Sequence, residues 1–323
     1  MSRSTMGEFD LIERYFRRPP QQPGSRLGVG DDCALLQPAP GTQLAISSDM
    51  LVEGRHFFAD VDPAALGHKA LAVNLSDLAA CGARPLAFTL ALALPAVEED
   101  WLAGFARGLF ELAEQHGCDL IGGDTTRGPR NICITVFGEV APGQALLRSG
   151  ARTGDELWVS GTLGDARVAL EALQGGLHLP PAGLAAARRR LEWPTPRVAL
   201  GQALRGVASA AIDVSDGLLG DLGHILARSQ CGATVDTDVV QGLLACPGIS
   251  AERRLDYTLA GGDDYELLFT APPTEREAVQ AAARASATPV TRIGRIDAAP
   301  GLRLLDAQGR PVGGRFASFD HFA

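Results

Sequence analysis

The amino-acid sequence predicts an α/β protein, with some segregation of helices and strands (α+β), built from two domains. Strand-like apolar runs alternate with segments whose apolar residues recur at helical spacing. The 323 residues also exceed the roughly 250–300 at which a single core stops growing. The pattern restarts near Ser149, with a turn, a strand and a glycine-containing loop. We therefore expect an N-terminal mixed-sheet domain over 1–149 and a C-terminal α/β sandwich domain over 150–323.

The first half opens with a strand, a helix and a second strand. Residues 44–48 (LAISS) are typical of a strand. Asp62 and Pro63 mark the start of a helix, whose apolar stripe continues until Gly82. The apolar run 88–94 (FTLALAL) predicts the next strand.

A second helix and two more strands complete this half. Asp100 is expected to cap a helix that ends at Gly117. Strands are expected at 118–121 and 132–140, separated by the turn-rich segment GGDTTRGPRN.

The second half repeats this alternation of strands, glycine-rich loops and helices. The expected elements are a helix at 166–173, a connection with one short helix at 173–196, a strand at 210–213, a loop at 214–217, a helix at 216–230 and a loop entering a strand at 261–270.

Composition excludes several classes of protein. The longest apolar stretch, 86–97, is too short to span a membrane, and the N-terminal segment lacks the pattern of a signal peptide, so a cytoplasmic protein is expected. Six cysteines without a CxxC pair are interpreted as buried core thiols. A net charge of −9 without a long basic run argues against nucleic acid as a partner. A phosphorylated ligand would need divalent cations to approach such an acidic protein.

Aspartates follow the apolar strands or lie in the glycine-rich turns beside them. This arrangement favours a site that binds Mg²⁺ and phosphate, since Mg²⁺ prefers oxygen ligands and ligand sites collect at strand ends. An Asp beside Gly is also a common turn signal, and Ser215 with Asp216 could simply cap a helix. The aspartates concerned are Asp31, Asp32, Asp49, Asp124, Asp213, Asp216, Asp263 and Asp264, with Asp77 on the first helix.

Common phosphate and zinc motifs are missing from the sequence. The single lysine, Lys69, is not part of a GxxxxGK[ST] loop, and no protein-kinase or HExxH signature occurs. His56 is a candidate substrate contact, although most histidines are surface or packing residues. Arg148 is a candidate phosphate ligand, with a surface ion pair as the alternative. Transfer of a phosphoryl group through metals needs no covalent nucleophile, and none is evident.

Nine segments in this order resemble the thiamine-monophosphate kinase family, within the ATP-dependent synthetases that include aminoimidazole ribonucleotide synthetase. They are GEFDLI, GVGDDCALL, SSDMLVEGRHF, KALAVNLSDLAACGA, LIGGDTTRG, RSGARTGD, IDVSDGL, GGDDYEL and FDHFA. The resemblance implies a two-domain synthetase-like fold, a homodimer joined through the N-terminal sheets, and direct transfer of the γ-phosphate of ATP to thiamine monophosphate with several Mg²⁺ ions.

The resemblance also implies roles for individual residues. The implied metal ligands are Asp32, Ser47, Ser48, Asp49, Asp77, Asp124, Asp213 and Asp216, the two serines partly through backbone oxygen. The implied ATP contacts are Gly123, Asp124, Arg148 and Ser215, and the implied substrate contacts are His56, Asp263 and Phe319. The family usually has Glu where this chain has Asp263, whose side chain is one methylene shorter. The alternatives are another synthetase of the superfamily, or a sensor that binds nucleotide without catalysis.

Overall fold

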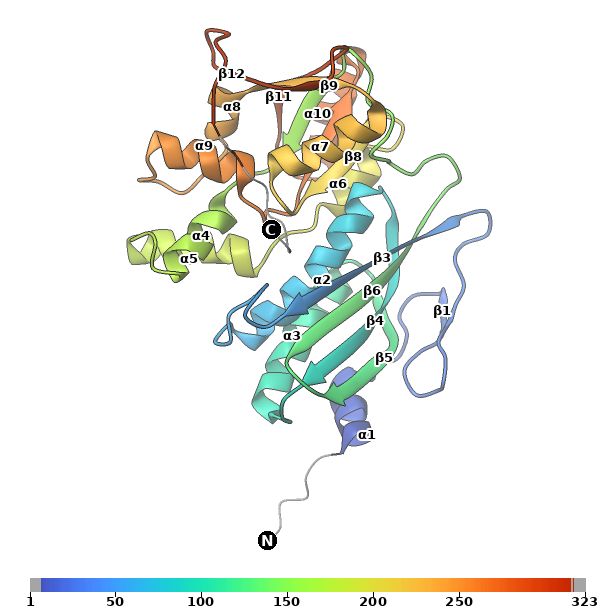
Figure 1. Cartoon of the computed structure of the whole chain (residues 1–323). Helices are drawn as coiled ribbons and strands as arrows, with labels where there is room; N and C mark the ends of the chain where they lie inside the picture. The colour runs from blue at the N-terminus through green and yellow to red at the C-terminus, as the bar shows by residue number, and fades with distance from the viewer. Residues whose placement is uncertain (1–6, 315, 317–323) are drawn as a thin grey trace. The chain divides into compact units, whose positions relative to one another are not determined.

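The computed structural model describes residues 7–314 and residue 316. The chain divides into two compact units (Figure 1). The first unit contains the described residues up to Leu78 and Ala83–Gly143, and the second contains Ala79–Gly82 and the described residues from Gln144 onward. Each unit has its own mixed sheet, so the expected α/β class is confirmed.

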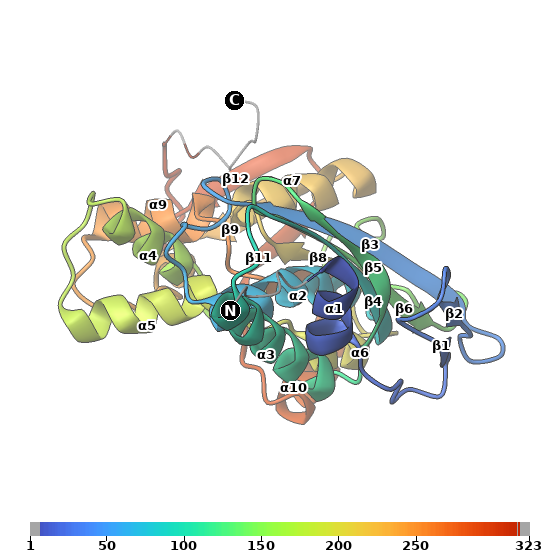
Figure 2. The same cartoon turned by 90° about the horizontal axis from the view of Figure 1, so that it is seen from below.

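The first unit is a four-stranded sheet with two long helices on one face. Its elements are α1 (Glu8–Leu11), the π-helix η1 (Ile12–Phe16), β1 (Ser25–Leu27), β2 (Leu35–Leu36), β3 (Gln43–Val52), α2 (Pro63–Ala80), β4 (Arg84–Leu94), α3 (Glu99–Gln115), β5 (Asp119–Arg127) and β6 (Asn131–Val140). The strand order is β3-β6-β4-β5, with β4 and β5 parallel and the other pairs antiparallel. Helices α2 and α3 lie side by side behind this sheet (Figures 1 and 2).

The close approach of α2 and α3 depends on two glycines. A Cβ atom on Gly67 would lie 2.1 Å from the Phe105 carbonyl oxygen, and one on Gly108 would lie 1.9 Å from that of Ala64. Because neither position has room for a side chain, the helix backbones meet there directly.

Two expectations for this unit were wrong in detail. The segment GGDTTR is not a turn but continues β5 to Arg127, where it pairs with β4 and leaves only 128–130 as the turn before β6. The β-branched Thr125 and Thr126 favour this extended conformation. Asp100 does not cap α3, since the N-cap residue is Glu98 and Asp100 lies inside the first turn.

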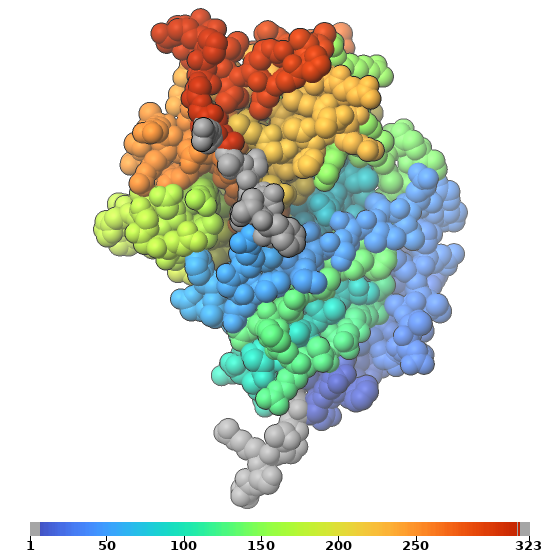
Figure 3. All heavy atoms as spheres, in the orientation of Figure 1, coloured from blue at the N-terminus to red at the C-terminus, as the bar shows by residue number. Residues whose placement is uncertain are grey.

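The face of this sheet that points away from α2 and α3, called here the outer face, is covered only in part. Ala34 and Leu36 pack over Ala87 and Ile121 at one end of it. Along β3, three apolar side chains are 44–59% exposed: Leu44, Ile46 and Met50. The space-filling view shows β3 in blue and β6 in green on the near side of the unit (Figure 3).

The second unit is built on a six-stranded sheet. Its elements are β7 (Glu156–Ser160), α4 (Asp165–Leu173), α5 (Pro181–Glu192), α6 (Val198–Ala203), β8 (Ala210–Val214), α7 (Leu218–Ser229), β9 (Gly232–Asp236), α8 (Thr237–Gln241), α9 (Ala251–Ala260), β10 (Glu266–Ala271), the 3₁₀ turn η2 (Pro273–Glu275), α10 (Arg276–Ala285), β11 (Val290–Asp297) and β12 (Gly301–Leu305). The strand order is β12-β9-β11-β7-β10-β8, in which β9 and β12 are parallel and the other pairs antiparallel.

The core of the second unit forms where α7 packs on the sheet. Leu222 and Ile225 of α7 are fully buried against Val159 and Ile212 of the strands. The expected helix at 216–230 begins two residues later, at Leu218, with Gly217 as its N-cap. Ser215 and Asp216 therefore lie before the cap position, which removes the simple capping interpretation of these two residues.

Two further expectations can be compared with the structure. Among the described residues, no helix is both long and apolar enough to cross a membrane. Cys118, Cys231 and Cys246 are buried thiols as expected, Cys81 and Cys133 are only partly buried, and Cys33 is exposed. The expectation was wrong for Cys33 because its segment between β1 and β2 is a surface loop and not a strand.

Candidate functional site

The first group of expected site residues lies between β3 and α2. Ser47 Oγ donates a hydrogen bond to Asp77 Oδ2, and the Asp49 backbone N–H donates to Asn74 Oδ1 at 3.0 Å. Asn74 is buried and donates to the Ala70 carbonyl at 3.0 Å, so the strand is anchored to the helix. Residues two apart share a strand face and residues three apart share a helix face, which explains why these pairs meet.

Ser48 lies on the opposite side of the same strand. Its hydroxyl donates to the Ile134 carbonyl at 3.1 Å and lies 3.0 Å from Thr135 Oγ1. Because successive side chains of a strand alternate between faces, the Ser48 side chain points away from Ser47 and Asp49. Its backbone oxygen is the part of Ser48 that can serve an ion on the side of α2.

The strand register separates Asp124 from Asp49. The row of cross-strand partners that starts at Asp49 runs through Ile134 and Leu90, both buried under the helices, and ends at Gly123. Asp124 belongs to the next row, which ends at the exposed Met50 on the outer face. Three strand spacings separate β3 from β5, roughly 14 Å. One Mg²⁺, whose ligands lie about 2 Å away, cannot bind both aspartates of one chain.

Gly123 allows β5 to approach β4 at this point. Its φ is +143°, and a Cβ atom would lie 1.8 Å from the Leu90 carbonyl oxygen. The loop that carries Asp32 also borders β5, since a Cβ on Gly28 would lie 3.9 Å from the Ile121 Cα. Gly123 and Asp124 thus form a second group on the edge strand β5, and the loop that carries Asp32 begins beside this strand.

His56 follows β3 in a tight turn. The imidazole Nδ1 of His56 accepts a hydrogen bond from the Val52 backbone N–H at 3.0 Å, and the backbone N–H of His56 donates to the Val52 carbonyl at 3.0 Å. A neutral imidazole with Nδ1 as acceptor carries its proton on Nε2. The turn therefore presents His56 as a hydrogen-bond donor through Nε2.

The third group lies in the second unit, where two loops run side by side. Asp213 is buried within β8, and the loop after this strand carries Ser215 and Asp216. The loop before β10 carries Asp263, whose backbone N–H donates to the Ser215 carbonyl at 2.9 Å. Gly262 permits this contact, because a Cβ there would lie 2.5 Å from that same oxygen. An expected ATP contact and an expected substrate contact are thereby joined directly.

Asp221, in the first turn of α7, organises the loop after β8. Its Oδ2 accepts from the backbone N–H groups of Ser215 at 3.1 Å and Asp216 at 3.2 Å. Burial, with the nearby Asp216 carboxylate, raises the pKa of Asp221 to about 7. Asp221 is not among the site residues expected from the sequence, although an acidic residue in a first helical turn is a recognisable signal.

Two expected residues remain apart from these groups. Arg148 is exposed and forms no ion pair within the described ranges 7–314 and 316, so the surface ion pair considered for it is not observed there. Its carbonyl accepts from Ser229 Oγ at 3.1 Å. Phe319 lies outside the described residues.

The donor atoms of the expected ligands suit a hard cation. They are carboxylate, hydroxyl and backbone oxygens, the ligands that Mg²⁺ prefers, and Mg²⁺ commonly takes only one or two carboxylates beside water and phosphate. Over the part of the chain that the structure describes, no three His, Cys, Asp or Glu side chains converge to hold a metal by themselves.

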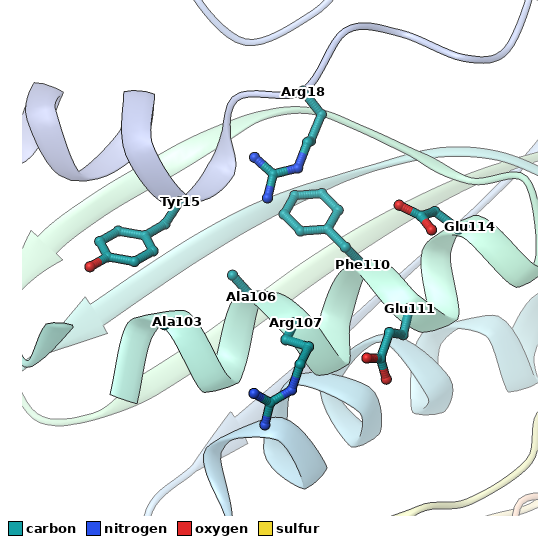
Figure 4. Close-up of a pocket in the computed structure, with 8 residues that line it drawn as sticks. All are labelled: Tyr15, Arg18, Ala103, Ala106, Arg107, Phe110, Glu111 and Glu114. Atoms are coloured by element: carbon teal, nitrogen blue, oxygen red, sulfur yellow. The ribbon is translucent and has the colours of Figure 1, made fainter. Parts of the chain in front are cut away.

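A cavity of about 390 Å³ lies elsewhere in the first unit, between the N-terminal segment and α3 (Figure 4). Tyr15, Arg18 and Phe110 line it, and the Arg18 guanidinium stacks 4.6 Å from the centre of the Phe110 ring. None of the expected site residues lines this cavity, so we do not assign the candidate chemistry to it.

Two family models match successive parts of the chain. Residues 30–140 match the N-terminal domain of AIR synthase related proteins, and residues 152–307 match the C-terminal domain. The chain is 48% identical to the thiamine-monophosphate kinase of Salmonella typhimurium and 47% identical to that of Escherichia coli, over 98% of each chain in both cases.

Several solved structures share the fold of this chain. A thiamine-monophosphate kinase from Stenotrophomonas maltophilia superposes with a TM-score of 0.86 at 47% identity, covering 95% of this chain and 98% of the other. AaThiL complexed with AMPPCP and TMP superposes with a TM-score of 0.75 at 29% identity, covering 88% and 89%. The hydrogenase maturation protein HypE in complex with ATP, at 22% identity and a TM-score of 0.76, shares the fold.

Proposed function

The chain belongs to the thiamine-monophosphate kinase family of AIR synthase related proteins, and we propose that it transfers the γ-phosphate of ATP to thiamine monophosphate, giving thiamine diphosphate and ADP. The observation that carries this proposal is the 47–48% identity to thiamine-monophosphate kinases over 98% of the chain. A related structure that binds AMPPCP and TMP together supports direct transfer between the two substrates.

The three groups of residues suggest a division of work between the units. In this proposal, residues 1–149 bind metal and ATP and form a dimer, and residues 150–323 complete the nucleotide and substrate site. The metal ligands are Asp32, Ser47, Ser48, Asp49, Asp77, Asp124, Asp213 and Asp216. Bound Mg²⁺ would neutralise the repulsion between these acids and the triphosphate.

The remaining residues bind and orient the two substrates. Gly123, Asp124, Arg148 and Ser215 contact ATP, and His56, Asp263 and Phe319 contact thiamine monophosphate. The Nε2 proton of His56 suits an oxygen acceptor such as a phosphate. The backbone bond from Asp263 to Ser215 supports simultaneous binding, because it keeps the acceptor loop against the nucleotide loop. No residue has to act as a covalent nucleophile.

A homodimer is part of the proposal, with the outer face of the first unit as its interface. Leu44, Ile46 and Met50 are exposed there and would be buried by a second copy. The roughly 14 Å between Asp49 and Asp124 also supports a shared site, in which each chain lends one edge of its sheet.

Complementation tests this dimer. Asp49→Ala and Asp124→Ala variants, each inactive alone, are expected to regain activity after mixing and refolding together if one site takes the two aspartates from different chains. A mixture as inactive as its components would contradict the shared site, and a monomer in sedimentation would contradict the dimer itself.

A cytoplasmic location accompanies the proposed activity. All six cysteines are free thiols in the structure, which is typical of proteins from a reducing compartment.

Release of ADP from ATP and Mg²⁺, with thiamine monophosphate, thiamine or no acceptor, tests the function. ADP and thiamine diphosphate are expected only with the monophosphate. ADP release without acceptor would favour another synthetase of the superfamily. Nucleotide binding without any release would favour the sensor.

A further inference from the structure

The loop before β10 carries an unusual backbone. Asp263 has a φ of +66° and Tyr265 a φ of +51°, although neither is glycine. Side chains with a Cβ atom rarely adopt the left-handed region because it brings Cβ close to the following carbonyl oxygen. Such conformations persist only where the surrounding structure imposes them, and they cluster at functional sites. Two left-handed residues within three positions therefore indicate that this loop has a functional role.

Buried anchors on one side of the loop impose this conformation. Both carboxylate oxygens of Asp264, a fully buried residue, lie 3.0 Å from the Gly164 backbone N–H. Glu266 has no exposed side-chain surface and binds Arg190 at 2.7 Å and Arg197 at 2.6 and 2.7 Å.

The alternate residues of the loop are left on the other side. Asp263 and Tyr265 are both half-buried, and the Tyr265 hydroxyl donates to Asp263 Oδ1 at 3.2 Å. The Asp263 N–H donates to the Ser215 carbonyl (2.9 Å) in the loop after β8, and the Tyr265 N–H donates to the Val214 carbonyl (2.8 Å) at the end of β8. The strained backbone thus holds a carboxylate and a phenol as one pair, beside the loop that carries Ser215.

We propose that Tyr265 is a positioning residue for the acceptor, which fixes the Asp263 carboxylate in the orientation that recognises an N–H donor of a nitrogen heterocycle in the acceptor. This inference rests on the proposed function, in which Asp263 contacts the acceptor. A hydrogen bond to one carboxylate oxygen removes rotational freedom of the carboxylate before the ligand arrives. Orientation of this kind matters more for Asp263 than for a Glu, because the shorter side chain has less freedom to search for its partner.

Steady-state kinetics of the full-length enzyme with Tyr265→Phe test the proposal. We expect KM for thiamine monophosphate to rise about tenfold, in line with loss of a hydrogen bond to a charged group. KM for ATP and kcat are expected to stay within about twofold, since the ring and the backbone anchors remain. Tyr257→Phe is the matched control, because the Tyr257 hydroxyl also donates to a carboxylate, Glu171 Oε2 at 2.7 Å, and this carboxylate belongs to α4 and not to the loop. Its KM should not change.

A double-mutant cycle separates positioning from packing. Asp263→Asn keeps the size of the side chain and an oxygen that can accept from Tyr265, and Asn tolerates positive φ. If the two residues act as one unit, Tyr265→Phe combined with Asp263→Asn should raise KM for thiamine monophosphate no further than the worse single variant. A double variant whose KM for thiamine monophosphate rises by the product of the two single effects would overturn the proposal. An unchanged KM in Tyr265→Phe, or an equal rise of KM in the Tyr257→Phe control, would overturn it as well.

The same assays distinguish failure of this inference from failure of the proposed function. A wild-type enzyme that forms no thiamine diphosphate refutes the function, and the inference with it. An active wild type with a Tyr265→Phe variant of normal KM refutes the inference alone. If Tyr265→Phe does not fold, as judged by thermal unfolding, Asp263→Asn must still raise KM for the acceptor; a normal value would then overturn the proposal.

Discussion

Replacing Gly123 by alanine should damage the first unit far more than the same change at the preceding residue. At Gly123 a Cβ atom would lie 1.8 Å from the Leu90 carbonyl oxygen, about 1.6 Å inside the shortest ordinary contact of 3.4 Å, and φ is +143°. Overpacking costs about 1–3 kcal/mol and an unfavourable positive φ about 1–2 kcal/mol, so Gly123→Ala should lose roughly 2–5 kcal/mol. That is a large share of the total stability of a domain.

Gly122→Ala is the matched control for this prediction. Its nearest neighbour would be Thr89 Cγ2 at 4.0 Å, and its φ is not positive, so its free energy of unfolding should change by less than about 1 kcal/mol. Both variants are one methyl group larger than the wild type and lie in the same strand. The comparison therefore isolates the close approach of β5 to β4.

Urea unfolding followed by hydrogen exchange provides the measurement. Peptides from β4 and β5 report on the first unit separately from the second, which matters because two units need not unfold together. We expect the midpoint of β4 and β5 to fall in Gly123→Ala and to remain near that of the wild type in Gly122→Ala. Equal midpoints for the two variants would refute the reasoning.

Three further changes test other parts of the structure. Glu266→Gln removes a buried charge that two partly buried arginines share and should cost about 3 kcal/mol in urea unfolding. Glu192→Gln, in a more exposed ion pair, should cost about 0.5 kcal/mol or less, and similar losses in the two variants would contradict this prediction. Burial lowers the pKa of His116 from 6.5, so the unfolded chain takes up a proton before the folded chain as pH falls, and stability of the first unit should decline below about pH 6.5. Tm measured as a function of pH should decline less in His116→Gln, and the same decline in the variant and the wild type would contradict this prediction. Asp221→Leu removes the acceptor of two backbone N–H groups and should raise KM for ATP at least tenfold, while Asp221→Asn retains an acceptor. Asp236→Ala is the control, because Asp236 forms similar bonds of 3.2 Å at another helix start, and it should leave KM for ATP unchanged. A raised KM for ATP in this control would count against a local effect of Asp221.

Much of the fold could be predicted because local signals agree with it. The Asp62-Pro63 start, the apolar stripe and Gly82 define α2 by capping and periodicity, which act within a few residues. The expected strand at 44–48 also exists, within the longer β3. The extension of β5 through GGDTTR could not be predicted, because the glycines that signal a turn here allow close pairing with β4, a contact between segments distant in sequence.

The sequence by itself determined the chemistry of this protein: which oxygen-bearing side chains follow its strands, and the ordered motifs that mark its family. Residue types and short spacings are written directly in the chain, and they suffice for recognition. Only the tertiary structure decided which of those residues meet. Strand register and alternation set Asp124 apart from Asp49 and turned Ser48 away from Ser47, and a backbone hydrogen bond joined Asp263 to Ser215. These relations arise from pairing across long sequence separations, for which no local pattern carries the information.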